Sequence, residues 1–307
     1  MGDFEERVDQ LKKDNDIVLL VHNYQRPEIQ DVADFLGDSL ELSIRATKVS
    51  QQNIVFCGVD FMAESAKVLS PRKRVVHPIE PPKLIAKCPM AAMVDVEGLQ
   101  ALKKQHPDSV VVSYVNTTAD VKAISDICCT SANAVKVVSS FPENKVIFVP
   151  DTNLGLYVQR FIKNKELILW AGYCRTHVWI TKDEILRLME EHPNAEVIVH
   201  PECTPDVIDL SDFVRSTQGM VMRVKESNSE EFIIGTEKEL VYRLSKENPN
   251  KEFYYSDRAV CPNMKQITPR NVVKSMETLE PEVILDEKTI ERARRPLERM
   301  IKIGRQD

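Results

Sequence analysis

Three of the seven cysteines in this chain recur at nearly constant spacing, and their thiols could bind a metal. Cys88, Cys174 and Cys261 lie 86 and 87 positions apart, and none belongs to a CxxC motif, so a local zinc ribbon is not indicated. Three thiolates can hold a cubane iron–sulfur cluster in which one iron has no protein ligand, whereas electron-transfer clusters normally have four cysteines. Such an iron can act as a Lewis acid on a substrate oxygen. The alternatives are a structural zinc site and three cysteines buried in a core.

Groups that can move protons recur with a similar period. His22, Tyr114 and His200 each close an apolar run, and they lie 92 and 86 positions apart. Two residues after each of them stands a further polar side chain: Tyr24, Asn116 and Glu202. A lone histidine at a strand end is usually a hydrogen-bonded structural residue, but two in equivalent positions favour chemistry. Glu202 is the best-placed general acid or base, and the phenol of Tyr114 can donate a proton or hold a carbonyl.

Three hydroxyl groups keep the same spacing: Ser39, Ser131 and Thr217. Each stands where a turn is expected to enter a helix. Hydroxyls and free backbone amides at helix N-termini bind phosphate or carboxylate, although a hydroxyl there can equally be a plain N-cap. Three in register favour an anion site, and the predicted ligand is a small molecule with several anionic groups.

An internal repeat of 86 to 92 residues explains this spacing, and each copy is long enough for a small domain. Each copy begins with an amphipathic helix, predicted at 5–13, 97–105 and 183–191, and a buried strand follows. Three aspartates keep step with the other anchors: Asp34, Asp126 and Asp212. A later apolar run ends at an acid in every copy, and these acids, interpreted as turn or inter-domain contacts, are Asp60, Asp151 and Glu237. His77 stands beside a proline in a connection, and we expect it at the surface.

Strands that alternate with helices predict an α/β fold of three similar three-layer αβα domains with parallel sheets, arranged around a pseudo-threefold axis. The predicted domains are 1–90, 91–176 and 177–269, and 270–307 is expected to pack back on the first. Ligands of parallel sheets bind at the carboxyl ends of the strands, which share one edge because the crossovers are right-handed. The polar residues that close the strands should therefore meet the three cysteines at one central site.

Composition restricts the class of protein. The 307 residues carry a formal net charge of −6 and are 43% hydrophobic, which suits several small cores and gives no basic footprint for nucleic acid. The chain has no 18-residue apolar run, so no membrane span is predicted. Its first residues are acidic and lack the apolar segment of a secretory signal. We therefore expect a cytoplasmic protein that binds small molecules.

Motifs along nearly the whole chain, from about Leu19 to Met300, resemble those of quinolinate synthase. In chain order, the segments that carry the resemblance are His22–Gln25 (HNYQ), Gly37–Ser39 (GDS), Gly58–Glu64 (GVDFMAE), Cys88–Ala91 (CPMA), Tyr114–Asn116 (YVN), Thr130–Ala134 (TSANA), Gly172–His177 (GYCRTH), His200–Cys203 (HPEC) and Cys261–Lys265 (CPNMK). The combination is highly specific. One departure is Gln218, which stands next to Thr217 where the family is expected to have a small residue.

This resemblance implies an enzyme of NAD biosynthesis, a transferase that condenses iminoaspartate with dihydroxyacetone phosphate to quinolinate with loss of phosphate and two waters. It implies a [4Fe–4S] cluster on Cys88, Cys174 and Cys261 with one open iron, and an upstream aspartate-oxidising enzyme as a partner. It also implies that the substrates contact eight residues: His22, Ser39, Tyr114, Asn116, Ser131, His200, Glu202 and Thr217. The predicted catalytic groups are Glu202 for proton abstraction, His200 or Tyr114 for proton transfer to leaving groups, and their neighbours His22 and Tyr24.

Two other functions are compatible with three cysteines and an open iron. An aconitase-like hydro-lyase would use the same kind of cluster but would not need three anion-binding turns. A non-enzymatic iron or redox sensor would use the cluster to control a partner, and its partner surface should be basic or apolar. The evenly scattered charges of this chain do not suggest such a surface.

Overall fold

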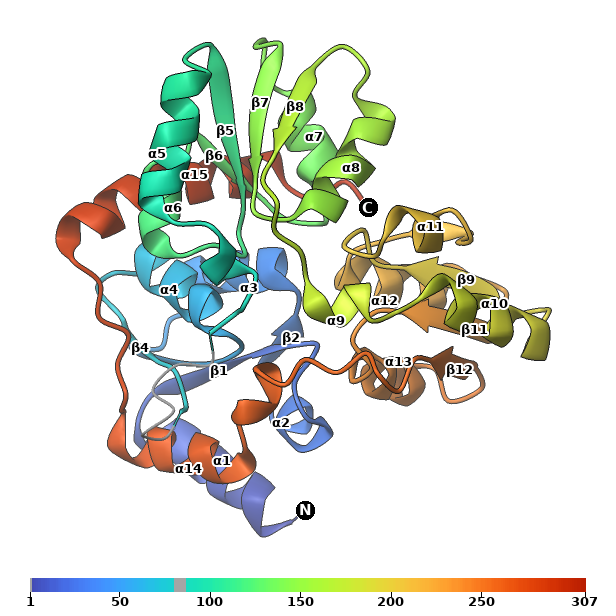
Figure 1. Cartoon of the computed structure of the whole chain (residues 1–307). Coiled ribbons are helices and arrows are strands. Elements are labelled where there is room, and N and C mark those ends of the chain that lie inside the picture. Colours follow the sequence, from blue (N-terminus) through green and yellow to red (C-terminus); the bar gives the residue numbers. More distant parts are fainter. Residues whose placement is uncertain (1, 80–86) are drawn as a thin grey trace.

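The computed structural model describes residues 2–79 and 87–307, and it contains three similar αβα units (Figure 1). Each unit has a four-stranded parallel sheet flanked by helices, and the strand orders β2-β1-β3-β4, β6-β5-β7-β8 and β10-β9-β11-β12 are equivalent. The predicted α/β class is therefore confirmed. The domain borders stay a prediction.

The elements follow the repeat. In the first unit they are α1 (Asp3–Asp14), β1 (Ile17–His22), α2 (Pro27–Asp31), β2 (Phe35–Gly37), α3 (Ser39–Lys48), β3 (Asn53–Cys57), α4 (Asp60–Leu69) and β4 (Arg74–Val76). In the second they are the 3-10 helix η1 (Ala91–Met93), α5 (Val96–Gln105), β5 (Ser109–Tyr114), α6 (Ala119–Ala123), β6 (Ile127–Cys129), α7 (Ala134–Ser139), β7 (Lys145–Val149), α8 (Thr152–Phe161) and β8 (Glu166–Leu169).

The third unit and the C-terminal segment complete the chain. They contain α9 (Arg175–Val178), α10 (Lys182–Glu191), β9 (Glu196–Val199), α11 (Pro205–Ile208), β10 (Phe213–Val214), α12 (Thr217–Glu226), β11 (Glu231–Gly235), α13 (Leu240–Glu247), β12 (Glu252–Tyr255), η2 (Met264–Gln266), α14 (Pro269–Thr278) and α15 (Glu287–Ile303). No helix in the described ranges is both long and apolar enough to span a membrane.

Alternate residues of the first strand in each unit face opposite sides of its sheet. Leu20 of β1, Val112 of β5 and Ile198 of β9 belong to one apolar core that is common to all three units. Their neighbours, such as Leu19 and Val111, pack in separate outer cores. Strands that are apolar on both faces are typical of parallel sheets covered by helices on both sides. The common core joins the three sheets around the centre of the molecule.

The recurrent aspartates Asp34, Asp126 and Asp212 have a structural role. Each carboxylate accepts a hydrogen bond from a backbone N–H of the first strand of its unit, at 2.7, 2.8 and 2.8 Å. The backbone N–H of the same aspartate donates to the carbonyl of that strand residue. Each aspartate therefore fixes the chain before the short second strand against the first strand. This repeated contact keeps the strand ends in equivalent places.

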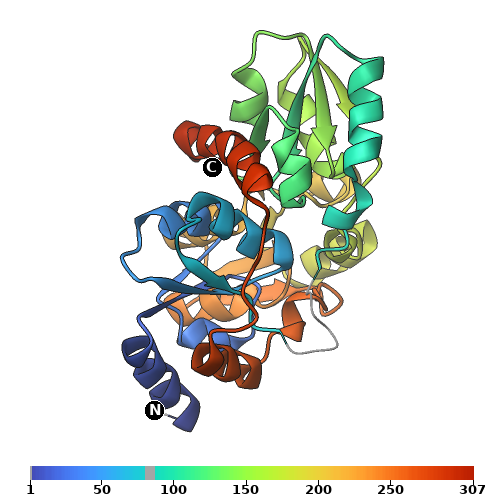
Figure 2. The same cartoon turned by 90° about the vertical axis from the view of Figure 1, so that its left-hand side faces the viewer.

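The C-terminal helices lie against more than one unit. α14 packs on α1, and its Val272 and Met276 enter the outer core of the first unit. α15, drawn in red, lies against α4 of the first unit and against α6 and β6 of the second (Figure 2). The segment after α15 then reaches the third unit, where Asp307 accepts a hydrogen bond from the backbone N–H of Ser216 at 2.6 Å.

Candidate active site

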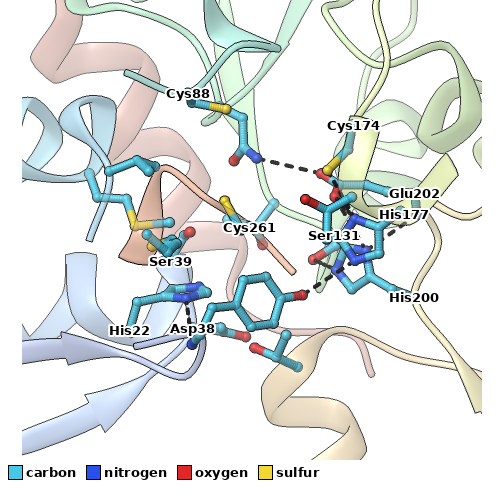
Figure 3. A pocket seen from close by; sticks show the side chains of 18 of the residues that line it. His22, Asp38, Ser39, Cys88, Ser131, Cys174, His177, His200, Glu202 and Cys261 are labelled. Atoms are coloured by element: carbon cyan, nitrogen blue, oxygen red, sulfur yellow. Dashed lines mark hydrogen bonds and ion pairs between the residues drawn. The ribbon is translucent and has the colours of Figure 1, made fainter. Parts of the chain in front are cut away.

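One cavity lies where the three units meet, and the structure places every residue that the sequence singled out for chemistry on its wall (Figure 3). They are His22, Tyr24, Ser39, Cys88, Tyr114, Asn116, Ser131, Cys174, His200, Glu202, Thr217 and Cys261. Further lining residues include Asp38, His177 and apolar side chains such as Phe61 and Met264. The carboxyl ends of the strands supply most of the polar groups, as expected for parallel sheets. The roles of these residues stay predictions, but their convergence is a property of the fold.

The three recurrent cysteines, one from each unit, line the same cavity (Figure 3). All seven cysteines fall within the described residues, and all are free thiols. Burial raises the pKa of the Cys88, Cys174 and Cys261 thiols, and the proximity of Cys88 and Cys261 raises the pKa of Cys174 further. The three half-buried thiols therefore remain protonated unless a cation compensates their charge. A bound metal supplies that compensation, since a coordinating thiol is deprotonated.

A second potential set of metal ligands overlaps the first. The donor atoms of Cys174, His177 and Glu202 lie within 4.8 Å of one another. His177 Nδ1 is 3.1 Å from Cys174 Sγ and 2.7 Å from Glu202 Oε2. The site can therefore bind metal through its sulfur, nitrogen and oxygen groups.

Glu202 is a deeply buried acid of the cavity wall. Only 2% of the residue is exposed, and its Oε1 accepts a 3.5 Å hydrogen bond from Asn116 Nδ2. Burial alone would raise the pKa of Glu202, but the nearby imidazole of His177, its hydrogen bond, His200 and the Tyr114 hydroxyl lower this pKa to about 2. The carboxylate is therefore ionised at neutral pH. The pKa of Tyr114 is raised by burial and by the charge of Glu202, so the phenol keeps its proton.

A chain of hydrogen-bonding groups connects Glu202 with Tyr24. His177 Nε2 lies 2.9 Å from Thr236 Oγ1, and the hydroxyls of Thr236 and Tyr24 are 2.5 Å apart. His177 is 1% exposed and Thr236 is fully buried. The path therefore joins a carboxylate, an imidazole and two hydroxyls through groups that can each donate or accept a proton.

His22 and His200 are held in the same way in the first and third units. The backbone N–H two residues later donates to Nδ1 of each ring, from Tyr24 to His22 at 3.2 Å and from Glu202 to His200 at 3.3 Å. A neutral ring that accepts at Nδ1 carries its proton on Nε2. Burial lowers the pKa of His22 to about 4 and that of His200 to about 3, so both rings are neutral at pH 7. Nε2 of His200 lies 3.2 Å from the Ser131 hydroxyl.

Ser39 and Thr217 are the first residues of α3 and α12, but the residue before each of them caps the helix. Asp38 accepts from the backbone N–H of Glu41 in α3, and Ser216 accepts from that of Gly219 in α12. The predicted alternative of plain N-capping therefore does not apply to Ser39 or Thr217. Ser131 lies in the turn before α7, three residues ahead of its first residue. All three hydroxyls face the same cavity.

The tail at residues 304–307 contacts all three of these turns. Arg305 pairs with Asp38 at 2.7 Å and donates to Ser216 Oγ at 2.8 Å. The backbone N–H of Gln306 donates to the carbonyl of Ala132 at 2.8 Å. The residues contacted precede Ser39, follow Ser131 and precede Thr217. The tail therefore ties together the hydroxyl-bearing turns of all three units.

Comparison with known proteins agrees with this geometry. The model of the family described as quinolinate synthetase A protein matches residues 6–302. A quinolinate synthase of Methanoregula boonei is 50% identical over 298 residues, which cover 97% of each chain. A quinolinate synthase of Pelobacter propionicus is 50% identical over 98% of each chain, and one of Geotalea uraniireducens is 52% identical over 94% of this chain and 93% of its own.

The chain belongs to the quinolinate synthetase A family. It is therefore an enzyme with quinolinate synthase function, which places it in the synthesis of NAD. Family membership also identifies its substrates as small molecules.

Three residues of this family member were not singled out individually from its sequence. His177 belongs to the GYCRTH motif and lies three residues after Cys174, so a one-turn helix at this point could have indicated that both face the same side. Thr236 gives no such signal, because no hydroxyl occupies the equivalent place in the other copies. Arg305 lies outside the repeat. The expectation for His77 was wrong, since this residue is only 7% exposed and its Nε2 is 2.8 Å from the carbonyl of Gly58.

Proposed function

We propose that this chain condenses iminoaspartate with dihydroxyacetone phosphate to quinolinate, phosphate and two waters in the central cavity. The observation that carries the proposal is that three cysteines, three hydroxyl-bearing turns and the Glu202 carboxylate line one cavity, with one cysteine and one hydroxyl turn from each unit. We further propose 1–90, 91–176 and 177–269 as the units that supply them. An upstream aspartate-oxidising enzyme is the proposed source of the imine.

The proposed cofactor is a [4Fe–4S] cluster held by Cys88, Cys174 and Cys261. The donor set fits such a cluster, because the three thiols are free and line the same cavity. Each cysteine comes from a different unit, so the cluster would join all three units. When bound, the iron without a cysteine ligand would supply a Lewis acid for a substrate oxygen.

Ser39, Ser131 and Thr217 are proposed to hold the carboxylates and the departing phosphate. The first turns of α3 and α12 add the partial positive charge of a helix N-terminus. Thr217 Oγ1 accepts a 2.9 Å hydrogen bond from Asn23 Nδ2, which leaves its own proton available to a ligand. These groups would orient a small polyanion between the three units.

Glu202 is proposed as the base that removes the proton from the carbon next to the imine. Its carboxylate is ionised, and the hydrogen bonds from His177, Tyr114 and Asn116 fix its orientation. His177, Thr236 and Tyr24 lie within hydrogen-bonding distance of one another in that order, so they are proposed to stabilise the charge and the orientation of the Glu202 carboxylate.

His22, His200 and Tyr114 are proposed to donate hydrogen bonds to substrate oxygens and to leaving groups. The neutral rings present Nε2–H, and the high pKa of Tyr114 keeps its phenolic proton in place. The lining residues are mostly buried, so water is largely excluded and the hydrolysis-prone imine is protected.

The decisive experiment is anaerobic purification of the full chain, followed by an iron and sulfide count and product analysis with both substrates. We expect about four irons per chain and quinolinate as the product. A single bound metal would instead favour a mononuclear site on Cys174, His177 and Glu202. Cys174→Ala should lose the cluster absorption, whereas Cys57→Ala, a core substitution in β3, should keep it. Iron-free protein that still makes quinolinate would end the proposal.

A further inference from the structure

An acid binds the backbone of the recurrent cysteine in every unit. The N–H of Cys88 donates to Asp60 Oδ1 at 3.0 Å, and that of Cys174 donates to Asp151 Oδ2 at 3.1 Å. The N–H of Cys261 donates to Glu237 Oε1 at 3.2 Å. The same contact therefore occurs three times, although the third copy uses the longer glutamate.

All three acids follow the third strand of their unit in sequence, which is an inner strand of its sheet. Asp60 comes three residues after the end of β3, and Asp151 and Glu237 come two residues after β7 and β11. The cysteines lie after the fourth strand of each unit, in the segment that leaves it. Each acid thus links a connecting segment to the central part of a sheet. A backbone N–H needs only an acceptor, and in each unit the acid's carboxyl oxygen supplies it.

These acids are costly for the fold. Asp151 and Glu237 are fully buried, and burial raises the pKa of all three carboxyl groups. Glu237 has a 2.9 Å ion pair with Lys265, but the contacts that lower the pKa of Asp151 are backbone N–H groups. A buried acid without strong compensation lowers stability. None of the three is among the described residues that line the cavity, so contact with substrate does not explain them.

We propose that Asp60, Asp151 and Glu237 are positioning residues that hold the three cysteine loops so that their sulfurs converge on one metal centre. The acceptor oxygen of each side chain restricts its cysteine at the backbone, one bond from the atom that bears the side chain. This inference rests on the proposed function, because it assumes that the three thiols share a ligand. It goes further by assigning these acids to assembly of the centre.

The test separates the hydrogen bond from the fold. Asp60→Ala, Asp151→Ala and Glu237→Ala remove the acceptor, whereas Asp60→Asn, Asp151→Asn and Glu237→Gln keep an acceptor oxygen. Asp126→Ala is the matched control, because it removes a carboxylate that also accepts a backbone N–H in the second unit but does not contact a cysteine. Thermal unfolding of each metal-free full-length variant shows whether it is folded. Asp60 is only partly buried, so its alanine variant has the best prospect of folding.

Two readouts are used. Arsenite added to the metal-free chain binds three thiols at once, forming three As–S bonds and releasing three waters, so its affinity reports convergence of the sulfurs without iron. Iron content and the resonance spectrum of the reduced, cluster-loaded chain report the centre itself. We expect each alanine variant to bind arsenite about tenfold more weakly, the order expected for loss of one hydrogen bond, with the amide variants and the control close to wild type.

The outcomes distinguish the inference from the proposed function. Wild-type arsenite affinity and an unchanged cluster in folded alanine variants would overturn the positioning role and leave the proposed function intact. Weaker arsenite binding in these variants, together with a wild-type chain that takes up no iron, would support the positioning role and refute the cluster. A loss of affinity in Asp126→Ala equal to that in the alanine variants would also overturn the inference, because the effect would then be a general one.

Discussion

Nδ1 of His177 lies 2.7 Å from Oε2 of Glu202, and both side chains are almost completely buried. The same imidazole approaches the sulfur of Cys174 at 3.1 Å. His177 therefore stands between the predicted base and a predicted metal ligand. Because both side chains are buried, water cannot replace either partner of the His177–Glu202 pair. We therefore expect the pair to act as one unit in catalysis.

Replacing either member of this pair should remove most of the turnover. We expect Glu202→Gln and His177→Gln each to lower kcat by about 10²- to 10³-fold, the range typical of a lost general base. The double variant should lose little more than either single variant, because residues that act as a unit are not additive. Quinolinate formation under anaerobic conditions measures the effect, with equal iron content as the control. Independent, multiplying losses would contradict the coupling.

His77 should make the fold sensitive to mild acid. Burial lowers its pKa to about 4, below the ordinary value of 6.5, so the unfolded chain takes up a proton first as the pH falls. The stability contributed by the neutral ring is therefore complete above pH 6.5 and is lost as the pH falls from 6.5 toward 4. Between about pH 7.5 and pH 5 this loss should be about 2 kcal/mol.

Denaturant unfolding at both pH values measures this loss. In His77→Gln the amide can still donate to the Gly58 carbonyl but cannot titrate. The variant should therefore show a smaller drop in the free energy of unfolding than the wild type, by about 2 kcal/mol. Equal drops in the two proteins would show that His77 does not titrate in this range.

Ser39→Ala should weaken substrate binding without weakening the fold. The cap of α3 is Asp38, so removal of the Ser39 hydroxyl leaves the helix terminus satisfied. We expect KM for an anionic substrate to rise about tenfold, as for one lost hydrogen bond to a charged group, with an unchanged melting temperature. Ser216→Ala is the contrasting variant, because Ser216 caps α12 and its loss should cost about 1 kcal/mol of stability. A destabilised Ser39→Ala with normal KM would refute the anion site.

The repeat accounts for how much could be predicted from sequence. A residue such as His200 has a counterpart in His22, so its place at a strand end follows from the period and from the geometry of parallel sheets. The helix boundaries and the cysteine positions follow for the same reason. The repeat does not, however, distinguish structural residues from catalytic ones. Asp34 and His22 both recur with the same period, although the Asp34 side chain only fixes a strand.

Contacts peculiar to one copy were beyond this reasoning. Tyr24 and Thr236 are 212 residues apart, and only the packing of the first unit against the third brings their hydroxyls together. His77 was misplaced because proximity to a proline indicates a connection but does not indicate what covers it. Its burial depends on a carbonyl at Gly58 that no side-chain pattern reveals.

The tail that contains Arg305 should stabilise the closed arrangement of the three units. Arg305 pairs at 2.7 Å with Asp38, whose side chain is only 8% exposed, and it also contacts Ser216 in the third unit. Arg305→Ala leaves the Asp38 carboxylate buried without this cation, and loss of one partner from a partly buried pair should cost about 2 kcal/mol. Because Asp38 and Ser216 are the N-caps of the helices that begin at Ser39 and Thr217, KM should rise as well.

Two control variants separate these effects. Arg305→Lys keeps the charge and should recover much of the stability. Arg299→Ala removes a guanidinium of α15 that lies outside the hydroxyl turns, and it should leave KM unchanged. Thermal unfolding and steady-state kinetics on the same iron-loaded samples measure both effects, and a lower melting temperature with normal KM would limit the tail to a structural role.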